Sequence, residues 1–519
     1  MTQHLPNPDA TSHTALTAPS AQPGKPVRNG QLVPTGEVPL LGVEDFRRAL
    51  IRAPQQHRRI VALFGAPSVD GLRLYCVLAG DGDGKLYVFG TAVTDNAFSS
   101  VTPECPQAQL FEREIFEQWG IRPEGHPWLK PVRFGDGRPG GNSAPPNLIG
   151  VTDFYRVDGD EIHEVAVGPV HAGVIEPGHF RFQCHGEQVL HLEISLGYQH
   201  RGIESAILSR PHKRLLPYME TAAGDTTIGH TTAYCQIVEA LSGTRVSARA
   251  HVLRAVALEL ERLANHVGGL GALANDVGFL STASFCGRLR GDYLNMTAQL
   301  CGSRFGRGLV RPGGTGFDVD AARVSALLEH LEATQRDVKS AVELLWDASS
   351  VQARFEGTGT VPTAMAESLG LVGVAARASG LERDVRQDMP AGLYRMVQIP
   401  VSVAPSGDVF GRAYVRWLEV QRSFSFVREQ LRNLPVGTTC ISPGPLKPEQ
   451  LCVSLVEGWR GEICHVALTD ASGEFATYKL VDPSFHNWMG LAMALRNQQI
   501  SDFPLCNKSF DLSYCGHDL

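Results

Sequence analysis

The sequence predicts an α+β fold, in which a small N-terminal α/β module precedes a large domain made of a helical bundle flanked by antiparallel β-hairpins. Three observations lead to this class. Short apolar runs separated by Gly/Asp turns fill the first part of the chain, apolar residues at helical spacing dominate the middle, and alternating runs return near the end. A length of 519 residues suits two or three domains rather than one.

The N-terminal part is expected to contain a tail, a module and a linker. Residues 1–39 are rich in Pro, Ser, Thr, Ala and Gln and predict a disordered tail. Residues 40–134 form the module, with helices expected at 43–51 and 111–119 and strands at 60–64, 72–78 and 85–90. Residues 135–147, GDGRPGGNSAPPN, have the composition of a linker and mark the main domain boundary.

The large domain is expected to span residues 148–519. Alternation on both sides of Gly186 predicts a β-hairpin over 179–194. Apolar residues then repeat every three or four positions, which is typical of bundled helices, at 231–241, 252–267, 292–301, 324–345 and 412–431. A second hairpin at 462–468 and 477–480 follows, and then a helix at 485–496 that Asp482 or Ser484 could cap.

The composition argues against several classes of function. A net charge of −7 without a basic stripe argues against a nucleic-acid binder. The chain has no GxGxxG or GxxxxGK[ST] motif, so a direct NAD site is not expected. Its eleven cysteines form no CxxC pair, so we expect it to bind no metal ion or iron–sulfur cluster itself. Without a membrane-length apolar run or a signal peptide, a cytoplasmic chain able to dock on a membrane complex is expected.

Several polar residues are candidates for chemistry, and each also has a purely structural explanation. His171 and His179 lie in a Gly/Pro-rich loop, where they could donate protons to a ligand or only bond to the backbone. Arg201 and Glu204 could pair within one helix or anchor a buried polar network around a cavity. Arg262 shares a helix with an apolar stripe, so it belongs either to a buried polar network or to a solvated face. The residues alone leave these alternatives open.

Motifs in a characteristic order reveal a resemblance to a known family. The segments FEREIFEQWGI (111–121) and EGHP (124–127) resemble the 30 kDa subunit of respiratory complex I. Later segments resemble the 49 kDa subunit, and they are still more similar to the large subunit of energy-converting nickel–iron hydrogenases of the formate hydrogenlyase type. These segments are GPVH (168–171), EPGH (176–179), GYQHRGIE (197–204), ELERLANH (259–266), RPGG (311–314), RASG (377–380) and DVFGRAYVR (408–416). From residue 40 onward, the chain therefore resembles the two complex I subunits fused, with a hydrogenase large-subunit-like fold.

The metal ligands of the hydrogenases are absent from this sequence. Hydrogenase large subunits hold nickel and iron with two CxxC pairs, and the four matching positions here are Ala223, Thr226, Ser513 and Gly516. Nickel needs thiolate donors in this geometry, which these residues cannot supply. The chain thus resembles the cysteine-less, energy-converting-hydrogenase-related group, and hydrogenase activity is not expected.

The resemblance implies a set of functional residues around the vacated cavity. In complex I the cavity takes quinone, and a loop histidine that matches His179 and a tyrosine donate to the quinone headgroup. The tyrosine position falls on Gly224 in this chain, so half of that pair is missing. We therefore expect protons to reach an acceptor through His179, His171, Asp225 or His230.

The resemblance also implies a membrane-associated oxidoreductase complex of the NADH:quinone oxidoreductase type. A partner iron–sulfur subunit would supply electrons to a quinone-like acceptor, and Arg201, Glu204 and Arg262 would form polar surroundings that couple redox change to a membrane arm. Glu204 matches a glutamate that looks like a magnesium ligand in the family. Antiporter-like membrane subunits are further expected partners, with the complex on the inner face of the cell membrane. The alternative is a non-catalytic subunit that keeps the fold as a structural or coupling element.

Overall fold

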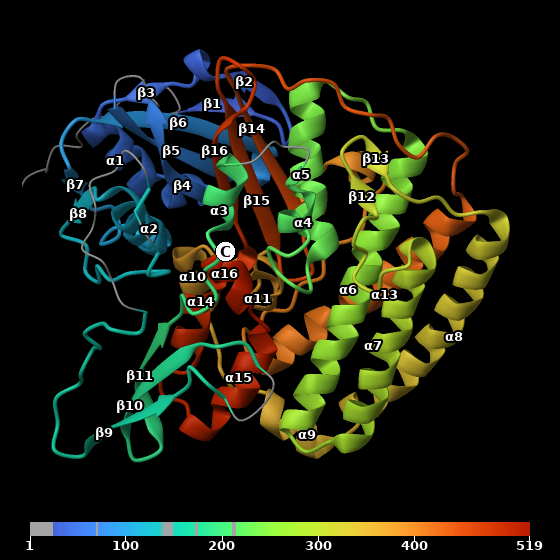
Figure 1. Cartoon of the computed structure of the whole chain (residues 1–519). Coiled ribbons are helices and arrows are strands. Elements are labelled where there is room, and N and C mark those ends of the chain that lie inside the picture. The colour runs from blue at the N-terminus through green and yellow to red at the C-terminus, as the bar shows by residue number, and fades with distance from the viewer. Residues whose placement is uncertain (1–23, 69–70, 136, 139–148, 172–174, 210–213) are drawn as a thin grey trace, which may run out of the picture.

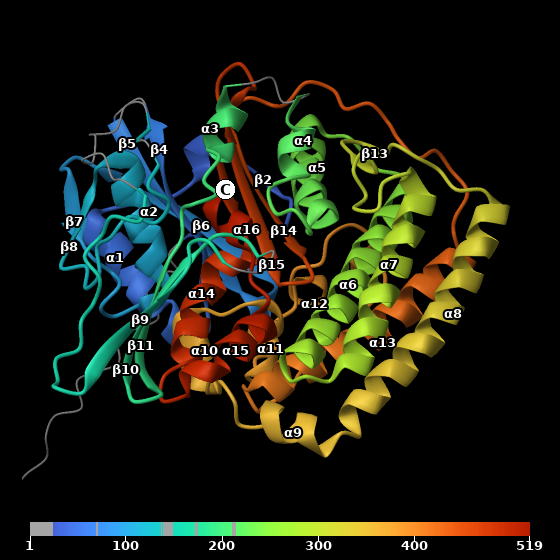
Figure 2. The ribbon, with the colours of Figure 1, turned by 60° about the horizontal axis from the view of Figure 1, so that its bottom comes forward.

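The computed structural model describes residues 24–68, 71–135, 137–138, 149–171, 175–209 and 214–519. Helices and mostly antiparallel sheets are both prominent in it, so the α+β class is confirmed. Figures 1 and 2 show the N-terminal module on one side, long helices on the other, and the C-terminal sheet between them.

The N-terminal module is a five-stranded sheet packed with two helices. Its strands follow the spatial order β1-β6-β5-β4, and β3 pairs in parallel with β6. The predicted helices and strands of this module are confirmed. They are α1 (Val43–Arg52), α2 (Gln109–Trp119), β4 (Arg59–Ser68), β5 (Gly71–Gly80) and β6 (Lys85–Val93), and the module adds β3 (Leu40–Leu41), β7 (Ala97–Ser99) and β8 (Arg122–Glu124).

The predicted disordered tail is wrong for its second part. Lys25–Val27 form β1, which pairs with β6, and Leu32–Pro34 form β2, which pairs with β14 (Gln450–Glu457). Each of these strands has only 3 residues. Such a strand is too short to show a period in the sequence, and hydrogen bonds to a distant strand hold it in place. Residues 1–23, and most of the predicted linker 135–147, lie outside the described part of the chain.

The C-terminal sheet joins the module to the helical bundle. Its strands, in spatial order, are β16 (Phe475–Val481), β15 (Glu462–Thr469), β14 and β2. Successive residues of a strand point to opposite faces. Leu451 and Leu455 of β14 belong to the core of the module, whereas Cys452 and Val456 belong to the core of the bundle. The predicted hairpin is thus confirmed, and the sheet that contains it is covered on both faces.

The bundle is built around α6, which packs against helices on several sides. The predicted helices are confirmed and most of them are longer than expected. They are α5 (Thr227–Ser242), α6 (Ala248–Asp276), α7 (Leu280–Cys301), α8 (Ala321–Trp346) and α13 (Val409–Arg432). Because α6 is enclosed by its neighbours, the polar side chains of its middle must find their partners inside the protein.

Shorter elements complete the fold. The first predicted hairpin is β10 (His179–His185) with β11 (Gln188–Ser195), and β9 (Ile162–Val167) pairs with β10. Asp482 caps α14 (Pro483–Ala494) by accepting a 2.9 Å hydrogen bond from the N–H of Ser484. The remaining elements are α3 (Ile203–Leu208), α4 (Leu216–Met219), α9 (Ser349–Phe355), α10 (Thr363–Leu369), α11 (Gly373–Ala378), α12 (Val385–Asp388), α15 (Phe503–Phe510), α16 (Tyr514–Asp518), β12 (Val310–Arg311) and β13 (Gly314–Thr315). Among the helices described, none is long and apolar enough to cross a membrane.

Candidate functional site

Two loops that are far apart in the sequence, 175–179 at the start of β10 and 221–226 before α5, meet at the helix α16. We call the place where these three segments meet the three-segment site. The carboxylate of Glu176 accepts hydrogen bonds from the backbone N–H groups of Tyr514 and Cys515, at 3.2 and 3.3 Å. The first loop is therefore attached directly to the first turn of α16.

Arg201 joins the second loop to the same helix. Its guanidinium donates to the carbonyl oxygens of Thr221 and Ala222 at 2.6 and 2.9 Å, and to that of Cys515 at 3.0 Å. Arg201 and Glu204 do not pair with each other, because Arg201 precedes α3 and its side chain turns toward α16. The pairing within one helix is therefore wrong, and the exposed Arg201 instead connects the second loop to α16 through backbone carbonyls.

The two loop histidines bond to the backbone of their own loop. His171 Nε2 lies 3.1 Å from the carbonyl oxygen of Gly178, and His179 Nδ1 lies 3.1 Å from that of Gly168. His179 Nε2 is buried and has no hydrogen-bond partner among the described residues. A buried polar atom without a partner is costly, so this nitrogen is suited to meet a ligand.

Asp225 is held by an arginine rather than left free. Its carboxylate receives a two-pronged hydrogen bond from Arg460, at 2.5 and 2.8 Å, and its side chain is 34% exposed. Its carbonyl oxygen accepts from Trp459 Nε1 at 3.0 Å and from Asn265 Nδ2 at 3.1 Å. Asp225 thus belongs to a partly exposed ion pair next to α5.

His230 belongs to a buried line of hydrogen-bonded groups, which we call the His230 chain: Asp482, His230, His465 and Tyr478. His230 Nε2 lies 3.0 Å from Asp482 Oδ2, and His230 Nδ1 lies 3.1 Å from His465 Nε2. His465 Nδ1 in turn lies 2.8 Å from the Tyr478 hydroxyl. None of the four side chains is more than 1% exposed. Both ring nitrogens of His230 are occupied, so it can reach an acceptor only through other groups.

One order of donors satisfies every bond of the His230 chain. Tyr478 donates to His465, His465 donates to His230, and His230 donates to Asp482. Burial, with His230 nearby, holds the pKa of His465 well below its ordinary value, which keeps that ring neutral. Burial opposes ionisation of Asp482, but the bond from His230 and the charge of Arg460 outweigh it and lower the pKa of this carboxyl.

The positions that match the hydrogenase cysteines do not form a metal site. Gly516 lies against Asp482, so that a Cβ atom at 516 would come within 2.7–2.9 Å of the atoms of that carboxylate. Ser513 Oγ instead accepts from the N–H of Gly516 at 2.9 Å and caps α16. Over the described residues, no group of three or more His, Cys, Asp or Glu side chains could hold a metal ion. A nickel–iron centre does not fit these residues, because thiolates are missing and one ligand position is blocked.

Glu204 is neutralised by cations of the protein itself. Its carboxylate pairs with Arg138, lies 3.1 Å from Lys479 Nζ, and accepts a 3.0 Å bond from the N–H of Leu480. Burial alone would raise its pKa, but Lys479, Arg138 and Arg133 lower the pKa to about 2. The position that resembles a magnesium ligand therefore faces an ammonium and guanidinium groups.

Arg262 is fully buried, so the network explanation is correct for this residue. It donates to Glu259 at 3.0 Å, to Glu419 at 3.3 Å, and to the carbonyl oxygens of Glu457 and Gly458 at 2.7 and 3.0 Å. The other charged or polar members of this network include His266, Arg377, Asp384, Arg386, Tyr394 and Ser423.

Reasoning from the sequence missed the roles of three residues of this region. Glu176 and Asp482 are described above, and Glu261 is buried below the start of α5. The carboxylate of Glu261 accepts bonds from the N–H groups of Ile228 and Gly229 at 2.7 and 3.2 Å, and burial raises its pKa to about 8. Glu176 lies in the same EPGH motif as His179, and this position in the motif could have marked it as a site residue. The roles of Glu261 and Asp482 depend on neighbours that are distant in the sequence.

Comparisons with known proteins agree with the resemblance. Residues 276–445 match the family described as "Respiratory-chain NADH dehydrogenase, 49 Kd subunit", and residues 76–140 match "Respiratory-chain NADH dehydrogenase, 30 Kd subunit". The carbon monoxide-induced hydrogenase of Rhodospirillum rubrum is 31% identical over 352 residues, covering 67% of this chain and 97% of that protein. Formate hydrogenlyase subunit 5 of Escherichia coli is 29% identical over 80% of this chain and 76% of its own length. An NADH-quinone oxidoreductase subunit of Thermus thermophilus is 28% identical over 68% of this chain and 92% of its own length.

Proposed function

This chain belongs to the family that unites the 49 kDa subunit of complex I with the large subunits of energy-converting hydrogenases, and it carries a 30 kDa-type domain as well. We therefore propose that it is the electron-accepting large subunit of a membrane-associated oxidoreductase complex. A partner iron–sulfur subunit delivers electrons, and a quinone-like acceptor receives them at the three-segment site. Nickel takes no part, and this chain binds no cofactor of its own.

The unpaired ring nitrogen of His179 is the observation that carries this proposal. Nδ1 of this ring is engaged with the Gly168 carbonyl, while the buried Nε2 has no partner among the described residues. Because Nδ1–H donates to the Gly168 carbonyl, Nε2 carries a hydrogen only when the ring is doubly protonated. In that state Nε2–H would donate to a carbonyl oxygen of a bound acceptor and transfer its proton as the acceptor is reduced, leaving the neutral ring. The attachment of the His179 loop to α16 through Glu176 orients this ring.

Other groups at the site would resupply the proton. Asp225 is partly exposed to solvent, and the charge of its partner Arg460 also acts on Asp482 at the end of the His230 chain. His230 would therefore act through Asp482 rather than by touching the acceptor. His171 would hold the loop that carries His179, through its bond to Gly178. Arg201, Glu204 and Arg262 would provide the fixed charges around these groups.

Exposed apolar side chains support a partner subunit next to the histidine loop. Val170 is 89% exposed, and Ile175 of the same loop is also exposed. Further exposed apolar side chains, Ile149, Val151 and Tyr155, belong to the segment whose Phe154 ring lies 5.2 Å from the His179 ring. A cluster of this kind is typical of a protein interface. We assign it to the iron–sulfur partner, because electrons must arrive close to the acceptor. Antiporter-like membrane subunits would complete the complex on the inner face of the cell membrane.

The alternative function is a structural or coupling subunit without chemistry. The observation that favours it is the pairing of the charged groups: Asp225, Glu204 and Arg262 all have complete sets of partners inside the protein. The replacement of the family's metal-binding cysteines would then mean that this subunit has lost its redox chemistry.

Single-turnover kinetics of the purified complex test the proposal. The iron–sulfur clusters of the complex would be photoreduced, and their reoxidation by a soluble quinone followed by absorbance. We expect His179→Ala to slow reoxidation at least tenfold, since a positioned proton donor is worth about 10²–10⁴-fold. His185→Ala is the matched control, because this histidine lies on the same strand with an exposed side chain. Unchanged rates for His179→Ala and His230→Ala would favour the structural alternative, and stoichiometric nickel would contradict both functions.

A further inference from the structure

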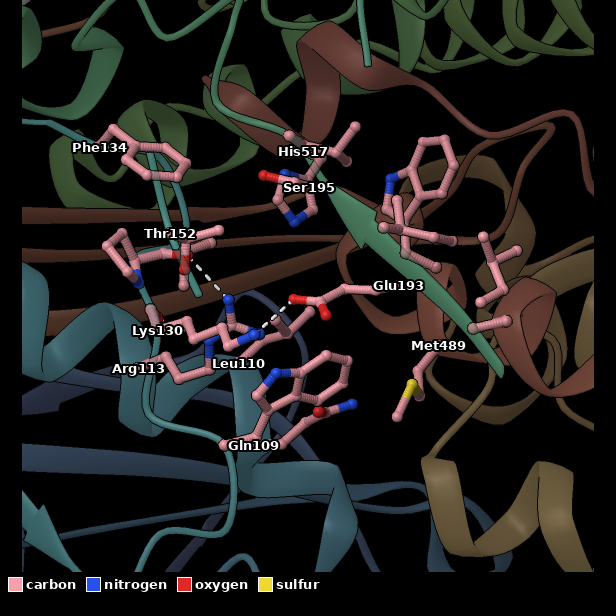
Figure 3. A pocket seen from close by; sticks show the side chains of 18 residues that line it. Gln109, Leu110, Arg113, Lys130, Phe134, Thr152, Glu193, Ser195, Met489 and His517 are labelled. Atoms are coloured by element: carbon pink, nitrogen blue, oxygen red, sulfur yellow. Dashed lines mark hydrogen bonds and ion pairs between the residues drawn. The ribbon is translucent and has the colours of Figure 1, made fainter. Parts of the chain in front are cut away.

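A crevice that is partly open to solvent lies between the module and the large domain. Residues of α2 and of the segment 128–134 form one wall, and residues of β11, α14 and α16 form the other. Figure 3 shows Lys130 and Glu193 pointing toward each other inside it, with Met489 on the opposite side. The proposed proton donors do not line it, so the crevice is separate from the three-segment site.

The crevice contains one positive charge that no direct ion pair with a described residue neutralises. Lys130 Nζ donates to Glu193 at 2.7 Å, and the other oxygen of Glu193 accepts from the N–H of Tyr155 at 2.7 Å, so this carboxylate is fully engaged. Arg113 donates only to two backbone carbonyls, from Nε and Nη2, each at 2.7 Å. Burial lowers the pKa of Arg113 to about 10, and nearby carboxylates offset this only in part. At neutral pH the guanidinium stays charged.

Most other lining groups are apolar or aromatic, and the remaining ones are the polar residues Gln109, Thr152, Ser195 and His517. Trp128 lies close to both cations, with its ring centre 5.7 Å from the Arg113 guanidinium and 5.5 Å from Lys130 Nζ. Trp488 is 3% exposed, and its indole N–H is buried without an acceptor among the described residues. A buried N–H donor without an acceptor indicates that a group able to accept its hydrogen bond is missing from this part of the crevice.

We propose that this crevice binds an amphipathic organic monoanion, with its carboxylate at Arg113 and its apolar body between Trp128 and Trp488. One unpaired cation calls for one negative charge, and a second negative charge would meet Glu193. A planar guanidinium binds a carboxylate through paired hydrogen bonds, and a neutral ligand would leave it without a counter-charge. The bound anion would join the module to the hairpin and helix that stand beside the three-segment site.

Fluorescence titration of the full chain tests this site independently of any electron transfer. The probe is 2-naphthoate, and the neutral probe of the same shape is 2-naphthamide. We expect 2-naphthoate to quench tryptophan emission saturably, and Arg113→Met to raise its Kd at least tenfold while leaving the weaker binding of 2-naphthamide unchanged. Arg122→Met is the matched control, because Arg122 is exposed in the same module.

A second variant guards against misfolding of the first. Ala492 lines the apolar part of the crevice, so Ala492→Leu should weaken both probes while Arg113 remains in place. Circular dichroism would verify that each variant is folded. The proposal is overturned if 2-naphthoate does not bind saturably, if Arg113→Met binds it as the unchanged protein does, or if Arg122→Met weakens it equally.

Discussion

Asp482 Oδ2 lies 3.0 Å from His230 Nε2, and neither side chain is more than 1% exposed. The same carboxylate lies against Gly516, with no room for a Cβ atom between them. The missing side chain at position 516 and the buried carboxylate–imidazole pair are therefore two aspects of one arrangement. A thiolate at 516 and the present position of Asp482 exclude each other.

Restoring a side chain at position 516 should destabilise the protein. Gly516→Ala places a Cβ atom within 2.7–2.9 Å of the Asp482 carboxylate, and we expect the free energy of unfolding to fall by about 1–3 kcal/mol. Gly444→Ala is the control, since nothing lies within 4 Å of a Cβ atom at that position. Urea unfolding of both variants checks this expectation, and equal stabilities would show that the carboxylate moves aside without cost.

The titration of Glu261 should make the protein less stable as the pH rises. Burial raises the pKa of this carboxyl from 4.5 to about 8, so the folded state favours its protonated form. The contribution of Glu261 to the free energy of unfolding is complete below about pH 4.5 and is lost as the pH increases toward 8. Glu261→Gln removes the titration and retains the size of the side chain. The free energy of unfolding, measured at several pH values from 5 to 9, should therefore fall for the unchanged protein relative to Glu261→Gln. A difference that does not vary with pH would contradict the assignment.

Glu204 should have the opposite dependence on pH. Burial opposes its ionisation, but Lys479, Arg138 and Arg133 outweigh this and lower the pKa from 4.5 to about 2. A lowered pKa stabilises the folded state above about pH 4.5, and this stabilisation disappears as the pH falls toward 2. The unchanged protein should lose its advantage over Glu204→Gln within that window. Thermal unfolding at pH 6, 4.5 and 3 would measure this, and parallel curves for the two proteins would rule it out.

Removing Arg262 should destabilise the core strongly. Arg262→Met leaves Glu259 and Glu419 short of one buried counter-charge, and breaking such a network costs about 3–5 kcal/mol. Arg432→Met is the matched control, because Arg432 pairs with Glu332 on the surface and should change stability by less than about 1 kcal/mol. Urea unfolding compares the two variants. Similar losses for both would mean that the buried network adds little.

Much of the architecture could be predicted from local patterns. Apolar residues at helical spacing predicted the helices that became α5, α6, α7, α8 and α13, because each one buries apolar side chains that recur every three or four residues. The strand β2 could not be predicted, because 3 residues show no period and the strand depends on its pairing with β14. The middle of α6 was ambiguous for a similar reason, since a polar residue within an apolar helix is exposed or buried according to what packs around it.

For the candidate site too, some residues could be identified from the sequence, whereas their partners could not. Motif positions identified His179, Arg201 and Glu204, and the replaced cysteines argued against nickel, because residue identity alone carries that information. The partners of these residues were not predictable. Arg201 turned away from Glu204 toward α16, and Asp482, which looked only like a helix cap, is also the partner of His230.

By itself, the sequence determined the family, the order of helices and hairpins, and the lack of thiolate ligands at the family positions. These are properties of local periodicity and of residue type at given places in a motif. The tertiary structure decided which polar groups are neutralised and which remain unpaired. Lys479 bonds to Glu114 at 2.6 Å across 365 residues of sequence, while Arg113 contacts no carboxylate in the described part of the chain. Pairing and burial depend on distances between segments that only the folded chain brings together.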